Sequence, residues 1–161
     1  MTDFSRLVAV VSIESVRLCE ASCRSFVDPS EVAQQIKVKA SQDTEVVKAP
    51  AEDGTDGALM IRASFRMVAS ADADEEERQA EVRGVFELSY QVPVDETFSE
   101  DELEAFGSIN AVFNAWPYWR ELVQASLARM NMPVLTVPLY RALPREPENG
   151  GVGDTHGATP N

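Results

Sequence analysis

Two stretches near the middle of the chain alternate apolar and polar residues with a period of two, and this alternation constrains the fold strongly. In residues 58–69 the apolar side chains share one face of a predicted strand: Leu59, Ile61, Ala63, Phe65 and Met67. In residues 80–92 the corresponding set is Val82, Phe86, Leu88 and Tyr90. Strands with this alternation have one buried and one solvated face. The pattern therefore predicts an antiparallel sheet that is covered on a single side.

Two further strands are predicted before this pair, at residues 15–26 and 32–40. The first changes phase near Leu18, because the apolar residues on either side of it fall on positions of opposite parity. A β-bulge at this point would bring both sets of side chains to one face. The second strand would point four side chains inward, Val32, Ile36, Val38 and Ala40. Residues 41–57 include a proline and two glycines and are predicted to form a loop.

The last third of the chain has helical periodicity. Ser99 and Glu102 form a capping-box pattern, which predicts the start of a helix. Apolar residues then recur at helical spacing, Leu103, Phe106, Ile109 and Phe113. Pro117 is unfavourable inside a helix but favourable in a first turn, so we expect a break at 114–116 and a second helix over 117–130. The apolar stripe of that second helix would be Leu122, Val123, Ser126, Leu127 and Met130.

These elements predict an α+β fold, in which a four-stranded antiparallel sheet is followed by C-terminal helices. Asn131 is expected to adopt the left-handed conformation that ends the last helix, and an extended apolar segment follows it. Residues 1–140 would form a single domain. Residues 141–161 have little apolar surface to bury and are predicted to be a disordered tail.

The chain is acidic, with a formal net charge of −13. Binding to nucleic acid or to an anionic membrane surface depends on lysine and arginine, so we expect neither partner. The opening residues lack the basic start of a signal peptide and are too short an apolar run to span a bilayer, which predicts a cytoplasmic protein without membrane insertion. Cys19 and Cys23 would lie roughly 13 Å apart on a strand, too far for a disulfide. Both are predicted to be small buried thiols.

The sequence offers little catalytic chemistry. Its only histidine, His156, lies in the predicted tail, which removes the commonest general base. The acidic run 71–77 lacks the glycine and the final glutamate of an EF-hand loop, so it is predicted to be a solvated turn. We therefore expect no enzyme activity, no metal and no cofactor. A binding function is the remaining possibility. Surplus apolar surface would then be covered by oligomerisation or by a partner that lies in a groove.

The segment around residues 114–140 contains the run Trp116, Pro117, Tyr118, Trp119, Arg120 and Glu121. This run resembles the aromatic-Pro-Tyr-x-Arg-Glu motif that opens a helix in the SecB family of protein-export chaperones. The pattern that follows is matched by Arg129, Met130, Pro133 and Leu135. The upstream order of strands, acidic turn and helix is similar as well, so the resemblance covers roughly residues 12–140.

The resemblance implies an ATP-independent holdase that assembles as a homotetramer, a dimer of dimers with central helices between two eight-stranded sheets. Such proteins bind unfolded precursor proteins in apolar grooves and deliver them to the SecA translocation motor. The acidic positions that contact SecA correspond to Glu20 and Glu81, but a third one corresponds to Arg24. The C-terminal helix of the family, which also contacts SecA, is replaced by a sequence rich in glycine and proline after Pro144.

Two alternatives to export remain open. One is a SecB-like chaperone dedicated to a single client, such as the antitoxin of a toxin–antitoxin pair, which Arg24 and the replaced helix would favour. The other is a structural oligomer without clients. For a chaperone, soft and aromatic side chains suit promiscuous apolar binding, and the predicted client-binding residues are Trp116, Tyr118, Trp119 and Met132. A packed corner is the alternative role for Trp116 and Tyr118.

Overall fold

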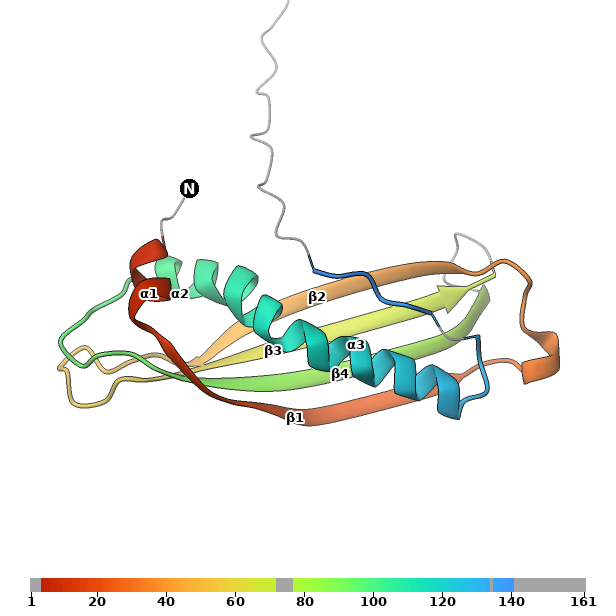
Figure 1. The fold of residues 1–161 in the computed structure, drawn as a ribbon, viewed down its shortest axis with the longest axis horizontal. Helices are drawn as coiled ribbons and strands as arrows, with labels where there is room; N and C mark the ends of the chain where they lie inside the picture. The colour runs from red at the N-terminus through yellow and green to blue at the C-terminus, as the bar shows by residue number, and fades with distance from the viewer. Residues whose placement is uncertain (1–3, 72–76, 134, 141–161) are drawn as a thin grey trace, which may run out of the picture.

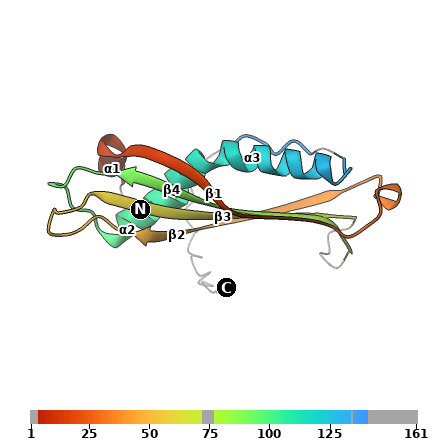
Figure 2. The same cartoon turned by 90° about the horizontal axis from the view of Figure 1, so that it is seen from below.

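The protein is described here by a computed structural model, which covers residues 4–71, 77–133 and 135–140. A four-stranded antiparallel sheet in the order β1-β4-β3-β2 carries the helices on one face (Figure 1, Figure 2). Its strands are β1 (Ser12–Ser25), β2 (Lys37–Lys48), β3 (Ala58–Ser70) and β4 (Arg78–Gln91). The helices are α1 (Ser5–Val10), α2 (Glu100–Phe106) and α3 (Val112–Arg129). This arrangement confirms the predicted α+β fold.

Two short helical pieces complete the architecture, a 3₁₀ turn η1 (Pro29–Glu31) and a π-helical turn η3 (Gly107–Ala111) that joins α2 to α3. The predicted tail at residues 141–161, which contains His156, lies outside the described residues. So does most of the acidic run 71–77, of which only the two ends are described.

The central strands β3 and β4 supply the core, as their alternation predicted. Their helix-side residues are all buried: Leu59, Ile61, Ala63, Phe65, Met67, Val82, Phe86, Leu88 and Tyr90. Phe65 lies opposite Gly84 in the register of the two strands. A Cβ on Gly84 would lie 2.7 Å from Leu122 and 3.3 Å from Trp119. The missing side chain is therefore what allows α3 to approach the sheet so closely.

Among the four strands, β2 differs most from the sequence prediction. It starts and ends later than expected, so much of the segment 41–57 is strand and not loop. Most residues of β2 are charged or polar, as is common in an edge strand. Such a strand lacks the apolar alternation from which the other strands were predicted. Val38 and Ala40 were predicted to point into the core, yet both are exposed. The helical segments that contact β2 lie over its other half, near Thr44.

Strand β1 begins earlier than predicted and has the expected bulge. The register shifts between Leu18 and Glu20, so that Leu18 and Ala21 both lie opposite helix-side residues of β4. The prediction of buried thiols is wrong, however, because Cys19 and Cys23 are both exposed. β1 is the outer strand of the sheet, and α3 packs mainly on β3 and β4.

The predicted helix break at 114–116 is also wrong, because α3 runs through Pro117 without interruption. The irregularity lies earlier, in the π-helical turn of η3. A π-turn changes the phase of the helix, and Phe113 is 60% exposed although Phe106 is buried. Pro117 itself is exposed. The carbonyl of Phe113, which loses its usual N–H partner, can therefore be hydrated on that side.

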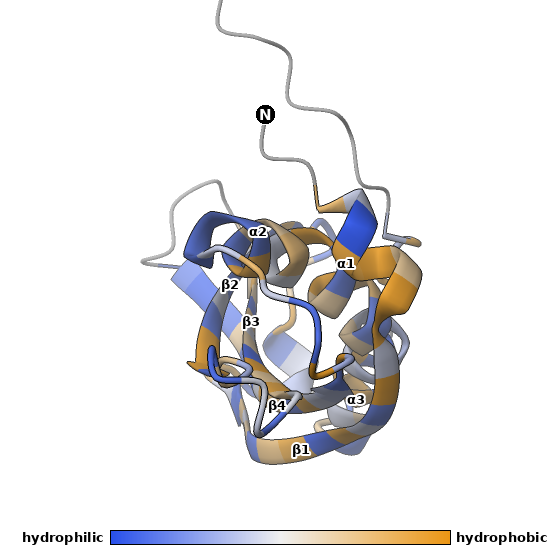
Figure 3. Cartoon of the chain, turned by 90° about the vertical axis from the view of Figure 1, so that its left-hand side faces the viewer, coloured by the Kyte–Doolittle hydropathy of each residue, from blue (hydrophilic) through white to orange (hydrophobic). Residues whose placement is uncertain are grey.

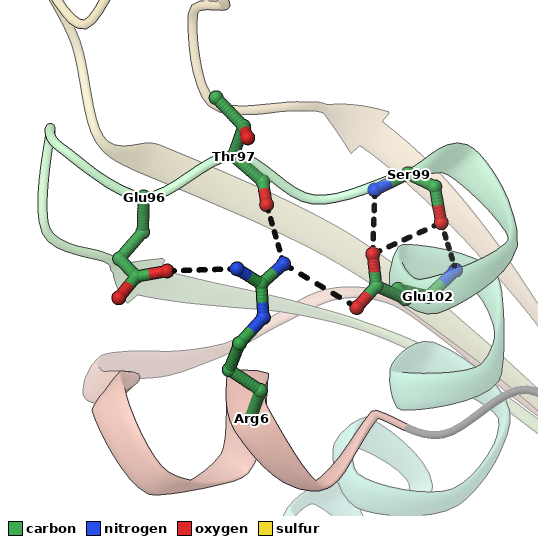
Figure 4. A network of polar contacts seen from close by, with 5 residues as sticks. All are labelled: Arg6, Glu96, Thr97, Ser99 and Glu102. Atoms are coloured by element: carbon green, nitrogen blue, oxygen red, sulfur yellow. Dashed lines mark hydrogen bonds and ion pairs between the residues drawn. The ribbon is translucent and has the colours of Figure 1, made fainter.

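The start of α2 and the end of α3 have the predicted capping residues, and a short additional helix, α1, contacts the start of α2. Ser99 and Glu102 form the capping box of α2, and Asn131 after α3 has a φ of 54°. Figure 4 shows how Arg6 of α1 contacts Glu96 at 3.0 Å and Glu102 at 3.5 Å. The sequence prediction missed α1, which lies beside α2 at one end of the sheet (Figure 3).

Candidate functional site

Trp119 and Met132, two of the predicted client-binding residues, belong to the core. Trp119 is 1% exposed, and its ring stacks on Phe65 with centroids 5.3 Å apart. Met132 is 5% exposed and lies in the same apolar cluster. Neither offers surface to a client in this arrangement. These two residues would affect client binding only indirectly, by packing beneath the residues that form the surface.

Trp116 is half-buried and lies on the β3 side of α3, where it contacts Phe65. Its ring meets Phe65 edge-on at 5.8 Å and Tyr140 at 5.2 Å. The indole Nε1–H donates a hydrogen bond of 2.8 Å to the carbonyl of Pro138. Residues 135–140, which we call the strap, run back along α3 at this point (Figure 1). Trp116 is thus covered in part by the C-terminal end of the described chain.

Arg120 is a second α3 residue that holds the strap, and the sequence analysis named it as part of the motif but not as a client-binding residue. Its Nε–H donates a hydrogen bond of 2.8 Å to the carbonyl of Val137. Arg120 follows Trp116 by four positions, so both side chains lie on the same face of the helix. The helical spacing was readable from the sequence, but the partner in the strap was not.

Tyr118 lies on the opposite flank of α3, towards β1. Its side chain is 51% exposed, and its ring is tilted against Phe86 at 6.5 Å. Leu18, which pairs with Phe86 across the strands, is 47% exposed. Other large apolar side chains of α1, β1 and α3 are also in water: Val8, Ile13 and Phe113. Tyr118 and Leu18 therefore present neighbouring apolar surface that the described chain leaves uncovered.

Glu81, a predicted SecA contact, lies on the open face of the sheet, opposite the helices, inside a cluster of arginines. Its carboxylate accepts a hydrogen bond of 2.7 Å from Arg83 and one of 2.8 Å from Arg66, with Arg78 at 3.6 Å. The bonds from Arg83 and Arg66 hold the pKa of Glu81 below its ordinary value, although partial burial acts in the opposite direction. The side chain is only 12% exposed. Three cations therefore already neutralise this carboxylate.

Glu20, the other predicted SecA contact, is exposed on β1 and lies opposite Val85. It borders a shallow concavity of about 560 Å³ on the open face, together with Ser22, Asp43, Ser64, Arg66 and Arg83. Arg24 lies opposite Glu81 in the register of β1 and β4. A second carboxylate of this face, Glu87, is 2.6 Å from Arg17. The open face is therefore a surface of paired charges and not an acidic patch.

A larger depression of about 1210 Å³ lies between β2 and α2 on the helix side. Seven carboxylate residues line it: Asp43, Glu45, Glu52, Glu96, Glu100, Asp101 and Glu104. No lysine or arginine is among its lining residues within the described chain. The sequence did not reveal this depression, because its two walls come from segments far apart in the chain. Glu96 pairs with Arg6 and Glu45 pairs with Arg62. The other carboxylates would attract a basic polypeptide segment over long range.

Within the described residues, no group of three or more histidine, cysteine, aspartate or glutamate side chains is arranged to hold a metal ion. None of the helices in that part of the chain is long and apolar enough to cross a membrane.

Comparison with known proteins identifies the fold. No protein-family model and no curated protein matches the chain. Among solved structures, the SecB-like chaperone Rv1957 of Mycobacterium tuberculosis, in complex with a ChAD peptide from the HigA1 antitoxin Rv1956, matches with a TM-score of 0.72. The match covers 86% of this chain and 96% of that one at 22% sequence identity. A protein of unknown function from Streptococcus agalactiae matches with a TM-score of 0.47 and 10% identity over 80% of this chain and 97% of that one. The first match shows that the fold of this chain is SecB-like.

Proposed function

We propose that this protein is an ATP-independent holdase dedicated to a particular aggregation-prone client, such as the antitoxin of a toxin–antitoxin pair. The proposal rests chiefly on the fold match to a SecB-like chaperone that was solved with an antitoxin peptide, a match that spans nearly the whole of that chaperone. It also fits the sequence, in which Arg24 and the segment after Pro144 depart from the SecA-binding pattern.

The surface chemistry supports a holdase. Tyr118 and Leu18 expose about half of their side chains next to the same core residue, and Phe113 exposes more. Exposed apolar patches of this kind mark interaction surfaces in soluble proteins, and either a client or a second copy of the chain would cover this one. The acidic depression beside α2 would add long-range attraction for basic stretches of a client and would raise the rate of encounter.

Delivery of precursor proteins to SecA has weaker support. A partner that docks on acidic residues needs carboxylates whose charge is available, and Glu81 is already paired with three arginines. Glu20 is exposed, but Arg24 follows it on the same strand and on the same side. We expect isothermal titration calorimetry with purified SecA to give no binding heat. A dissociation constant in the micromolar range or below would favour the export function instead.

We further propose that the protein is cytoplasmic and assembles as a homotetramer, a dimer of dimers. Edge strand β1 and the outer side of α3 carry the uncovered apolar residues that such an assembly would bury. Light scattering coupled to size-exclusion chromatography measures the mass directly.

The holdase function is tested by the aggregation of a chemically denatured protein diluted into buffer. We expect a stoichiometric amount of this protein to delay light scattering equally with and without ATP. The same assay with the antitoxin of a toxin–antitoxin pair as the aggregating protein tests whether the client is of the proposed class. If neither substrate is protected, the chain is a structural oligomer and not a chaperone.

A further inference from the structure

The hydrogen bonds between the strap and α3 do not depend on the side chains of the strap. They use its backbone carbonyls, that of Val137 accepting from Arg120 Nε and that of Pro138 accepting from Trp116 Nε1. Every residue type, including proline, has a backbone carbonyl. The two donors therefore recognise an extended chain and not a particular sequence.

The side chains of the strap add an apolar component with an alternating pattern. Leu135, Val137 and Tyr140 are partly buried against the core, and the Tyr140 ring lies 5.2 Å from that of Trp116. Leu139 is instead 70% exposed. The alternation holds over residues 135–138, because Thr136 and Pro138 are exposed, and it ends at Leu139. Such alternation is typical of an extended segment with one side on an apolar surface. An unfolded client could present the same features at many places in its sequence.

We propose that the α3 surface formed by Phe65, Trp116 and Arg120 is a binding site for extended apolar polypeptide, and that the strap is its resident occupant, which a client displaces. This inference rests on the proposed holdase function and specifies where and how the client is held. The client's carbonyls would accept the hydrogen bonds that Val137 and Pro138 accept now. Its apolar side chains would replace those of Leu135, Val137 and Tyr140.

An intramolecular occupant lowers the apparent affinity for a client, because the client binds only the fraction of molecules whose site is free. The strap is tethered to α3 through a short connection, so its effective concentration at the site is high, of millimolar order. A substitution that loosens the strap without touching α3 should therefore tighten client binding. A substitution that damaged the binding site itself would instead weaken client binding.

The matched variants are Val137→Asp and Leu139→Asp in the full chain. Both place one carboxylate in the strap, but Val137 packs against the core whereas Leu139 faces water. The probe is a fluorescein-labelled peptide with the sequence MPVLTVPLY, the sequence of residues 132–140. By fluorescence anisotropy we expect Val137→Asp to bind it about tenfold or more tightly than the unmodified protein. Leu139→Asp should stay within about twofold, and equal affinities for the two variants would overturn the inference.

A second substitution tests whether the peptide binds at the proposed surface. Trp116→Phe removes the indole N–H but keeps an aromatic ring, so in the Val137→Asp background it should weaken peptide binding by about two- to tenfold. An unchanged affinity would mean that the peptide binds elsewhere. If Val137→Asp does not fold, as judged by circular dichroism, Tyr140→Ser loosens the strap by removing the ring contact and takes its place.

The outcome can be separated from that of the holdase proposal. If the unmodified protein suppresses aggregation but Val137→Asp and Leu139→Asp bind the peptide equally, the strap inference fails and the chaperone function stands. If no form of the protein suppresses aggregation or binds the peptide, both fail together.

Discussion

Trp116 and Trp119 are three positions apart in α3, yet their surroundings assign them different tasks. Trp119 fills the space between Phe65 and Gly84 and is almost completely buried. We expect Trp119→Ala to lower the free energy of unfolding by about 3–5 kcal/mol, because it removes a large buried ring and leaves a cavity. Trp116→Ala removes a half-buried ring and one hydrogen bond, so its cost should be about 1–3 kcal/mol. Urea denaturation monitored by circular dichroism measures both.

Tyr118→Ala is the matched control for these two tryptophan variants, because Tyr118 lies in the same turn of α3 but is half exposed. Its cost should stay below about 1 kcal/mol in the isolated protomer. If Trp116→Ala lowers the free energy of unfolding as much as Trp119→Ala does, both rings belong to the core and the proposed difference between them is wrong.

Tyr90 is a buried ionisable residue whose environment has a measurable consequence. Burial raises its pKa to about 12, although the hydrogen bond donated by Asn114 Nδ2 acts in the opposite direction. The unfolded chain releases the tyrosine proton near its ordinary value of 10.0, before the folded protein does. The contribution of the neutral, buried Tyr90 to the free energy of unfolding is therefore complete below pH 10 and is lost as the pH rises towards 12.

We expect the free energy of unfolding to fall over this interval by about 2–3 kcal/mol more in the unmodified protein than in Tyr90→Phe. All other ionisable groups are common to the two proteins, so the difference between them isolates Tyr90. Denaturation in urea at a series of pH values gives the two curves. Parallel curves would indicate that the Tyr90 hydroxyl reaches water.

At the scale of elements, the continuity of α3 through Pro117 is the feature that departs most from expectation. Proline within a helix loses one hydrogen bond and crowds the preceding turn. We therefore expect Pro117→Ala to raise the free energy of unfolding by about 1–3 kcal/mol. Glu121→Ala, an exposed substitution one turn later, should change it by less than about 0.5 kcal/mol. If Pro117→Ala is neutral or destabilising, Pro117 begins a helix and does not lie inside one.

The elements that the sequence predicted correctly are those whose own side chains determine their position. β3 and β4 are covered on one face, so burial imposes an alternation that can be read directly, from Leu59 to Tyr90. β2 is a polar edge strand, and its place in the sheet depends on backbone pairing with β3 that leaves no pattern in the sequence. The π-helical turn η3 changes the helix phase within a few residues, which periodicity alone does not reveal.

The candidate site was only partly predictable for a related reason. The motif around Trp116 drew attention to α3, because tryptophan and proline are rare and conspicuous. Which ring is core and which is surface depends on Gly84 and on the strap, both distant in sequence. The pairing of Glu81 with three arginines likewise depends on the register of β3 and β4, so the sequence showed the acid but not its neutralisation.

At the scale of the whole molecule, the two edges of the sheet differ in what they offer to another copy of the chain. Charged edges resist pairing with another strand. β2 carries five charged residues, Lys37, Lys39, Asp43, Glu45 and Lys48, and β1 carries four, Glu14, Arg17, Glu20 and Arg24, so charge alone separates the two edges only slightly. β1 has the exposed Leu18 beside Tyr118 of α3 and would bury both on pairing. Two sheets joined through β1 would form the eight-stranded sheet that the proposed assembly requires.

Leu18→Asp and Val47→Asp test this choice of edge with the same substitution. Leu18 is 47% exposed on β1, and Val47 is 41% exposed on β2. A carboxylate buried in an apolar contact costs at least about 1.4 kcal/mol, so Leu18→Asp should raise the dissociation constant of the oligomer about tenfold or more. Val47→Asp should leave the mass unchanged, as measured by light scattering over a dilution series. Dissociation by Val47→Asp alone would place the interface on β2 and would leave the apolar surface around Leu18 and Tyr118 free for clients.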